Sequence, residues 1–128
     1  MDKRKILLID DDDSVLVYLT AKLSKVFDVV STVDATEAAA LARTHLPDVI
    51  LCDIDMPEMS GGEVAKVLEE DTLTARIPFI YLTSLVSPSE TKDMDGMVSG
   101  RPGVSKRAQL SELLERIEEV LKRPGAQG

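Results

Sequence analysis

Short apolar runs alternate along this chain with stretches in which apolar residues recur at helical spacing. The runs predict strands near residues 5–10, 28–33, 48–53, 77–83 and 102–105. Because strands and helices alternate, the pattern indicates repeated βα units with parallel strands, an α/β fold.

Helices are predicted between these strands from the spacing of apolar residues. The first spans residues 14–26, and Asp34 with Glu37 forms a capping-box pattern that opens an alanine-rich helix over 38–43. Gly61 and Gly62 precede a third, short helix. The apolar residues expected to face the core from the first and third helices are Val15, Leu19, Leu23, Val26, Val64, Val67 and Leu68.

The last helix has the clearest amphipathic pattern, with a charged face opposite the apolar one. Its apolar stripe consists of Leu110, Leu113, Leu114, Ile117, Val120 and Leu121. Pro124 and Gly125 should end it, which leaves residues 124–128 as a flexible tail. Between residues 84 and 102, Ser87 and Pro88 resemble a helix start, and we expect a short helix followed by a mobile loop. The whole pattern predicts one domain over residues 3–123 with about five helices.

The composition of the chain disfavours several classes of function. The 128 residues carry a net charge of −8, which disfavours direct binding to nucleic acid or anionic lipid. No signal segment or apolar span of membrane length occurs, so we expect a cytoplasmic protein without membrane insertion. The single cysteine, Cys52, lies within an apolar run and is expected to be a buried structural thiol, and His45 a surface residue.

Polar residues that follow or close the apolar runs are the candidate functional residues. They are Asp10, Asp11, Asp53, Thr83 and Lys106. Because the carboxyl ends of parallel strands lie along one edge of an open sheet, these side chains can converge in one crevice. Carboxylates, a hydroxyl and an ammonium at one point indicate phosphoryl transfer with a divalent cation.

The chemistry explains why these residue types are needed together. A carboxylate that attacks a phosphoryl group approaches an anion, and further carboxylates nearby increase the repulsion. Mg²⁺ (or Mn²⁺) relieves it, because such a cation takes carboxylate oxygens, here from Asp10 or Asp11 and Asp53. The terminal oxygens of a phosphorylated Asp53 would be held by the cation, by Lys106 and by Thr83 with backbone N–H groups.

A purely structural interpretation is available for each residue alone. Asp12, Asp13 and Ser14 are expected only to cap the first helix, and a threonine such as Thr83 at a strand end is ordinary. The presence of all the candidates at strand ends, in this order, favours the functional interpretation.

With these residues the chain resembles the receiver domain of two-component response regulators, over about residues 4–122. The matching segments are Ile-Leu-Leu-Ile-Asp-Asp-Asp at 6–12, Pro-Asp-Val-Ile-Leu-Cys-Asp-Ile-Asp-Met-Pro-Glu-Met-Ser-Gly at 47–61, Ile-Pro-Phe-Ile-Tyr-Leu-Thr-Ser at 77–84 and Ser-Lys at 105–106. The second is the most specific, because that family follows its phospho-accepting aspartate with x-x-Met-Pro-x-Met-x-Gly.

The resemblance implies a flavodoxin-like, doubly wound sheet of five parallel strands in the order 2-1-3-4-5. It implies Asp53 as the phosphorylation site, Asp10 and Asp11 as the acidic pair, and Thr83 and Lys106 as phosphate-binding residues. It also implies that the backbone carbonyl of Asp55 is a metal ligand.

Two positions depart from the family pattern. The family usually has Lys-Pro, commonly with a cis bond, where this chain has Lys106 followed by Arg107. It usually has an aromatic residue where Gly103 stands. We therefore expect a trans bond after Lys106, since a cis bond before a residue other than proline costs about 2.5–4 kcal/mol. In the family, that aromatic ring turns inward on phosphorylation. Gly103 has no side chain to turn, so we expect any conformational switch of this chain to lie within residues 85–102.

Three other classes of protein compete with this interpretation. Asp53-Ile-Asp55 matches the start of haloacid-dehalogenase-type phosphatases, but in those the acidic pair follows the lysine and a cap domain is common. A flavodoxin would need a Ser/Thr/Gly-rich phosphate loop where this chain has four aspartates. A receiver-like interaction module that is never phosphorylated remains open, because of Gly103 and Arg107.

The sequence thus predicts a phospho-accepting response regulator. Its donor would be a histidine kinase or a histidine phosphotransfer protein, and its output a contact with a downstream protein target. It would be no enzyme beyond catalysing its own phosphorylation and dephosphorylation. A stand-alone regulator and an excised domain are equally consistent with the sequence.

Overall fold

The computed structural model describes residues 3–84, 97–98 and 101–122. Its sheet contains strands β1 (Lys5–Ile9), β2 (Asp28–Thr32), β3 (Val49–Asp53), β4 (Phe79–Thr83), β5 (Met97–Val98) and β6 (Arg101–Ser105). The strand order is β2-β1-β3-β4-β6-β5, and all neighbours are parallel except β5 and β6. The five parallel strands therefore have the predicted order 2-1-3-4-5, with β6 as the fifth.

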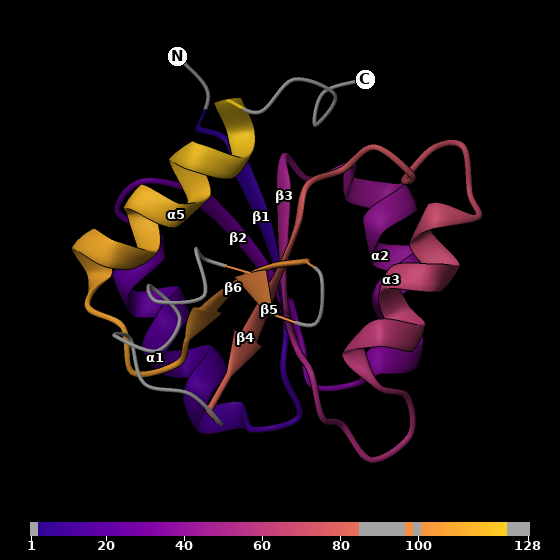
Figure 1. The fold of residues 1–128 in the computed structure, drawn as a ribbon, viewed down its shortest axis with the longest axis horizontal. Helices are drawn as coiled ribbons and strands as arrows, with labels where there is room; N and C mark the ends of the chain where they lie inside the picture. The colour runs from indigo at the N-terminus through magenta and orange to yellow at the C-terminus, as the bar shows by residue number, and fades with distance from the viewer. Residues whose placement is uncertain (1–2, 85–96, 99–100, 123–128) are drawn as a thin grey trace.

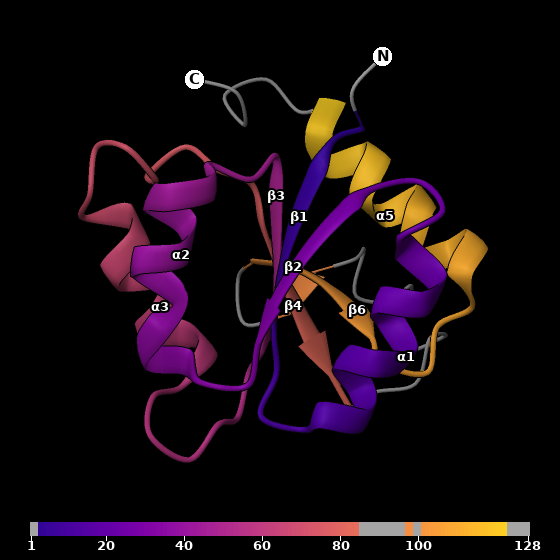
Figure 2. The same ribbon diagram turned by 180° about the vertical axis from the view of Figure 1, so that it is seen from behind.

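Helices cover both faces of this sheet. In the described residues they are α1 (Asp13–Leu23), the short 3-10 helix η1 (Ala35–Glu37), α2 (Ala38–His45), α3 (Gly61–Glu69) and α5 (Leu110–Lys122). Figure 1 shows α1 and α5 on one side of the sheet and α2 and α3 on the other, and Figure 2 shows the same two layers from behind. The doubly wound α/β architecture predicted from the sequence is confirmed.

Each face of the sheet carries its own apolar core. Ile6, Leu8 and Leu51 point toward α1 and α5, whereas Leu7 and Ile50 point toward α2 and α3. All five side chains are fully buried. Strands buried on both faces need apolar residues at every position, which is why their sequences are continuous apolar runs rather than alternating ones.

The first and third helices differ from prediction at their apolar positions. Helix α1 ends at Leu23, where Ser24 caps it and directs its backbone N–H to the Thr20 carbonyl. Val26 therefore lies beyond the helix and is 46% exposed, so its predicted place in the core was wrong. Val67 of α3 is 39% exposed, and the buried apolar side chains of that helix are those of Val64, Ala65 and Leu68.

The helix α5 matches its predicted stripe closely. Leu113, Ile117, Val120 and Leu121 are buried, and Leu110 and Leu114 pack against the same core while partly exposed. Its predicted end at Pro124 and Gly125, the tail over 124–128 and the helix start at Ser87 and Pro88 lie outside the described residues.

The start of α2 uses a different cap from the predicted capping box. Asp34 accepts hydrogen bonds from the backbone N–H and the hydroxyl of Thr36, which opens η1. Glu37 accepts a hydrogen bond from the Thr32 hydroxyl instead of reaching back to Asp34. A reciprocal capping box does occur at α3, between Ser60 and Glu63, where the sequence shows the same Ser-x-x-Glu spacing.

The short strand β5 was not predicted. It pairs antiparallel with the start of β6, with Met97 opposite Pro102 and Val98 opposite Arg101. Two residues are too few to produce a recognisable alternation, so the sequence offered no signal for this strand.

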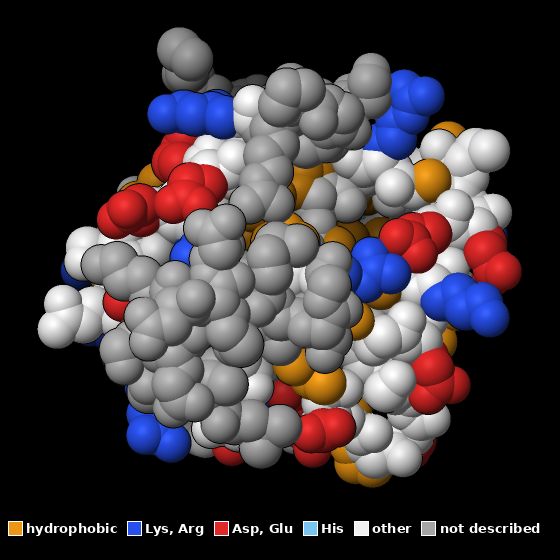
Figure 3. All heavy atoms as spheres, in the orientation of Figure 1, with side chains coloured by type: hydrophobic (Ala, Val, Ile, Leu, Met, Phe, Trp, Pro, Cys, Tyr) orange, Lys and Arg blue, Asp and Glu red, His pale blue; other side chains and the backbone are white. Residues whose placement is uncertain are grey.

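The surface of the described residues is charged and mixed. On the face seen in Figure 3, lysine and arginine side chains are scattered among acidic ones. Among the helices that the structure describes, none is both long and apolar enough to cross a membrane.

Candidate phosphoryl-transfer site

The acidic residues of the candidate site meet where β1 and β3 end. Ile9 pairs with Cys52, so the next residues, Asp10 and Asp53, are neighbours at the edge of the sheet. Carboxylate oxygens of Asp10, Asp11 and Asp53 all lie within 4.8 Å of one another. Asp10 and Asp53 are buried, whereas Asp11 is exposed. The structure thus brings the predicted acidic cluster together, with one carboxylate open to solvent.

Lys106 provides the positive charge of this cluster. Its Nζ lies 2.7 Å from Asp10 Oδ2 and 3.2 Å from Asp53 Oδ1, so one ammonium bridges two carboxylates. The residue follows the last residue of β6, and its backbone N–H donates to the Thr83 carbonyl oxygen over 2.9 Å.

Thr83 closes β4 at the same edge of the sheet. It is buried and lies in register with Ser105 of β6, between the strand that ends in Asp53 and the strand that precedes Lys106. All five candidate residues therefore share one edge. The role of the Thr83 hydroxyl stays a prediction.

Burial and like charge perturb the protonation of Asp53. Loss of hydration and the Asp10 charge, opposed by Lys106, together raise the pKa of its carboxyl from 3.8 to about 6. Burial also disfavours the charged form of Lys106, but the Asp10 and Asp53 carboxylates outweigh it and raise the pKa of the ammonium. The site thus holds excess negative charge that one lysine does not fully neutralise.

The donor set fits a hard divalent cation. Asp10 Oδ1 accepts a hydrogen bond from the Asp12 backbone N–H, but no donor in the described residues makes a well-directed hydrogen bond to the buried Oδ2. That oxygen is left with its ion-pair contact to Lys106. Carboxylate oxygens are ligands that Mg²⁺ prefers, so the oxygens of this cluster fit such a cation. Asp55 is exposed in the loop after β3, and the predicted role of its carbonyl stays a prediction.

Gly61 holds the loop after β3 against the site. Its N–H donates to the Ile54 carbonyl over 2.7 Å, and a Cβ at this position would lie 2.4 Å from the Asp53 carbonyl oxygen. Only glycine allows this close approach without moving the backbone of Asp53. The glycine at the end of the 47–61 motif thus has a structural reason.

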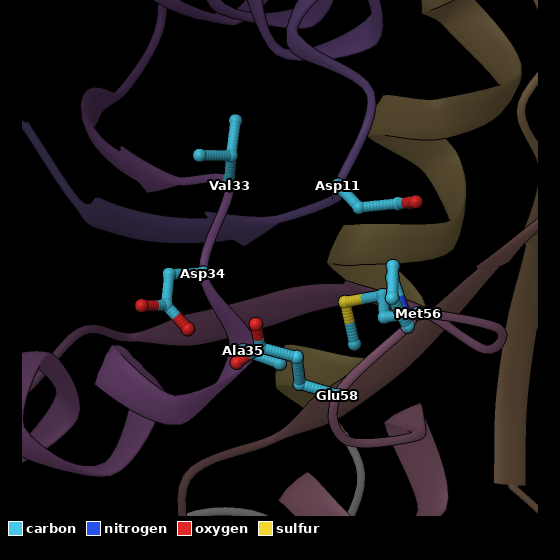
Figure 4. A pocket seen from close by; sticks show the side chains of 7 residues that line it. Asp11, Val33, Asp34, Ala35, Met56 and Glu58 are labelled. Atoms are coloured by element: carbon cyan, nitrogen blue, oxygen red, sulfur yellow. The ribbon is translucent and has the colours of Figure 1, made fainter.

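A cavity of about 380 Å³ opens beside Asp11. It is lined by Asp11, Val33, Asp34, Ala35, Met56, Pro57 and Glu58, and Figure 4 shows their side chains around it. Three of these residues are acidic, so the approach to Asp11 is negatively charged and open to a cation.

The remaining predictions for single residues are mostly met. Cys52 is fully buried, and loss of hydration raises the pKa of its thiol far above the ordinary range, which suits an inert structural residue. Asp12 caps α1 by accepting a hydrogen bond from the Ser14 backbone N–H. His45 is half-buried at the last turn of α2. No peptide bond in the described residues is cis, so the predicted trans bond after Lys106 is confirmed.

Sequence reasoning matched Ser105 to the family pattern as part of the Ser-Lys segment but gave it no role. Its side chain is buried and its hydroxyl accepts a hydrogen bond from the backbone N–H of Arg107. A serine at a strand end followed two residues later by a residue other than proline is the available signal, but it is a weak one.

Comparison with known proteins points to one family. Residues 6–118 match the family model described as the response regulator receiver domain. The chain is 34% identical to Protein PilH of Pseudomonas aeruginosa, over 91% of this chain and 97% of that protein. It is 30% identical to Histidine kinase P4 of Formosa agariphila, over 94% of this chain but only 9% of that protein. It likewise spans 18% of Response regulator PleD of Caulobacter vibrioides, at 40% identity.

Solved structures agree with these sequence relatives. The chemotaxis protein CheY4 of Vibrio cholerae is 27% identical with a TM-score of 0.77, over 92% of this chain and 98% of that one. The receiver domain of the sensor histidine kinase PA1611 of Pseudomonas aeruginosa has a TM-score of 0.78 at 22% identity, over 94% and 99%. That receiver was crystallised with a magnesium ion coordinated in its active-site cleft.

Proposed function

This chain belongs to the response regulator receiver domain family, and on that premise we propose that it accepts a phosphoryl group from a phosphohistidine donor onto Asp53. The observation that carries the proposal is the bridge of the Lys106 ammonium between Asp10 and Asp53, within a cluster of three carboxylates. Three carboxylates this close together do not stabilise the fold, but they suit a site that binds a cation and a phosphoryl group.

Asp53 is the nucleophile in this proposal. An oxygen of its ionised carboxylate forms the new P–O bond while the P–N bond of the donor breaks, and the imidazole takes up a proton as it leaves. With a pKa of about 6, Asp53 is largely ionised at neutral pH. The Lys106 ammonium is close enough to Asp53 to bind one oxygen of the transferred phosphoryl group and stabilise its negative charge. The Thr83 hydroxyl is assigned to another phosphoryl oxygen.

Asp10, Asp11 and Asp53 would hold Mg²⁺ or Mn²⁺, with the Asp55 carbonyl as a further ligand. The cation supplies charge neutralisation between the carboxylates and the incoming phosphoryl group. This assignment is supported by the three carboxylates that lie close together and by the all-oxygen donor set.

The partners follow from the reaction. The donor would be a histidine kinase or a histidine phosphotransfer protein, and the output a changed contact with a downstream protein, in the cytoplasm. Catalysis would be limited to the chain's own phosphorylation and dephosphorylation.

A donor must reach Asp53 across the surrounding surface. We assign its docking to α1 near Asp13, Ser14 and Val17, with the loop over 55–59. Val17 is 62% exposed, which suits contact with a partner. Met56 and Met59 are partly buried against the core, so their packing role limits their share in docking.

The test is the intact mass after incubation with acetyl phosphate and Mg²⁺. We expect one phosphoryl adduct, lost when Mg²⁺ is chelated and absent in Asp53→Asn. An adduct that persists in Asp53→Asn, or none in the parent protein, contradicts the proposal. The second outcome favours the receiver-like module that is never phosphorylated.

Docking is tested separately with Val17→Ala. We expect slower transfer from a cognate kinase but unchanged reaction with acetyl phosphate, because Val17 lies outside the site. Loss of both reactions would indicate damage to the site rather than to a docking surface.

The output of this receiver would depend on a conformational change that follows phosphorylation. Gly103 is in register with Tyr81 and has no side chain that can turn inward, so we assign switching to residues 85–102, of which 85–96 and 99–100 lie outside the described residues. Amide exchange with and without beryllofluoride tests this. Protection gained mainly within those residues is expected, and changes confined to the metal site would contradict it.

A further inference from the structure

The chain turns sharply directly after β6, at the point where Lys106 enters the site. The Ala108 backbone N–H donates to the Ser105 carbonyl oxygen over 3.0 Å, which closes a turn over residues 105–108. Lys106 and Arg107 are the two central residues of that turn. The conformation of this turn therefore sets where the Lys106 side chain begins.

A second hydrogen bond is nested inside the turn. The Ser105 hydroxyl accepts from the Arg107 backbone N–H over 3.1 Å, so the side chain of the first residue holds the third. The Ser105 side chain is only 2% exposed, which limits competition from water for this bond. The bond is possible because residue 107 is not proline, which has no N–H to donate.

Lys106 is consequently fixed from both sides of its backbone. Its own N–H donates to the Thr83 carbonyl, and the next N–H along the chain is held by Ser105. A lysine side chain has a long flexible stem, so its ammonium is placed accurately only if its origin is held. The Lys106 Nζ lies only 2.7 Å from Asp10 Oδ2 and 3.2 Å from Asp53 Oδ1, so a small displacement of its backbone would disturb both contacts.

We propose that Ser105 is a positioning residue for phosphoryl transfer, whose hydroxyl holds the turn that places the Lys106 ammonium between Asp10 and Asp53. Ser105 does this work in place of a proline ring, through a side-chain hydrogen bond rather than a fixed dihedral angle. Because Lys106 serves the reaction proposed above, this role of Ser105 depends on that proposed function.

Ser105→Ala tests the role directly. With acetyl phosphate and saturating Mg²⁺, we expect the rate at saturating donor to fall about tenfold, because Lys106 is displaced from the transferring group. Mg²⁺ affinity measured by calorimetry should stay within about twofold, since the carboxylates that bind it are not altered. Ser105→Thr keeps the hydroxyl and should restore the rate.

Amide exchange supplies a readout that does not depend on activity. The Arg107 N–H should exchange faster in Ser105→Ala than in the parent, and Ser105→Thr should protect it again. Thr74→Ala is the matched control, because Thr74 is also a buried hydroxyl but donates to the Leu68 carbonyl away from the site. It should lower the melting temperature and leave the phosphorylation rate unchanged.

A double-mutant cycle identifies the partner of the hydroxyl. If Ser105 acts through the Arg107 N–H, Ser105→Ala should change the rate little in an Arg107→Pro background, where that N–H is gone. A full tenfold loss in that background would overturn the proposed route.

These experiments distinguish a failure of the proposed function from a failure of the role of Ser105. A parent protein that takes no phosphoryl group removes both the proposed function and the role of Ser105. A phosphorylated parent with an equally fast Ser105→Ala variant overturns only the role of Ser105. A loss in Ser105→Ala that Thr74→Ala reproduces would mean that Ser105 is merely structural.

Discussion

The interior of strands β1 and β3 and the carboxyl ends of the same strands are similarly buried but contribute oppositely to stability. Leu8 and Leu51 are fully buried among apolar side chains, and Asp10, one step beyond β1, is equally inaccessible. Removing an apolar side chain from water is favourable, whereas removing a carboxylate is costly unless it is fully paired. Here three carboxylates lie close together, and the Lys106 ammonium contacts only two of them, those of Asp10 and Asp53.

The difference shows which part of this fold provides stability and which part provides function. Burial of the apolar interior stabilises the folded state, and this offsets the cost of holding charged groups together at the strand ends. Substitutions in the interior should therefore cost stability, whereas neutralising Asp11 or Asp53 at the edge should gain stability and impair the reaction.

The largest effect on stability is expected in the interior. Leu51→Ala removes a fully buried side chain from the central strand and should lower the free energy of unfolding by about 2–5 kcal/mol. Urea denaturation measures it, and Val17→Ala, at an exposed position, should change it by less than about 0.5 kcal/mol. Equal effects of the two variants would remove the contrast between interior and surface.

Asp53→Asn should act in the opposite direction. In metal-free protein at neutral pH we expect it to raise the free energy of unfolding by about 1–2 kcal/mol, because it removes a buried charge beside Asp10. Added Mg²⁺ should then raise the melting temperature of the parent but not of the variant. A variant less stable than the parent would mean that Asp53 has structural partners that outweigh the repulsion.

The pH dependence of this gain follows from the raised pKa of Asp53. The folded protein binds the Asp53 proton more tightly than the unfolded chain does, since the pKa is about 6 rather than 3.8. Stability from this group is therefore lost as the pH rises from about 4 to about 6. The advantage of Asp53→Asn over the parent should be present at pH 7.5 and absent near pH 4, as urea denaturation in the presence of a chelator measures.

Asp11→Ala and Asp12→Ala sharpen the comparison within one loop. Asp12 caps α1, so its loss should lower the free energy of unfolding by about 1 kcal/mol and leave Mg²⁺ affinity nearly unchanged. Asp11 has its carboxylate in the acidic cluster, so its loss should weaken Mg²⁺ binding and raise the melting temperature of the metal-free protein slightly. Equal Mg²⁺ affinities by calorimetry would contradict these assignments.

The smallest effect is expected for a charged pair in solvent. Arg101 makes two hydrogen bonds to Glu69, whose side chain is largely exposed. Glu69→Gln should lower the free energy of unfolding by less than about 1 kcal/mol, because water already stabilises both charges. A loss as large as that of Leu51→Ala would mean that charge, rather than burial, decides the contrast drawn above.

Much of the fold could be predicted because burial on both faces leaves a direct trace in the sequence. Residues 6–9 of β1 and 49–52 of β3 are all apolar, and α5 has an apolar stripe, so runs and periodicity located these elements. Val26 failed because apolar character alone does not reveal that Ser24 ends the helix first. The capping box at Asp34 failed because Glu37 has a nearer partner in Thr32.

The sequence alone determined which chemical groups stand at the strand ends. Asp10, Asp53 and Thr83 follow or close apolar runs that can be recognised without a structure, and Lys106 follows the short predicted strand at 102–105. Only the tertiary structure decided how they are paired: that Lys106 bridges two carboxylates, and that a hydrogen bond from the Arg107 N–H to Ser105 holds its backbone. The reason is physical. Burial pattern is a property of each segment, whereas contacts between strand ends depend on register and turn geometry, which arise only when the strands are assembled.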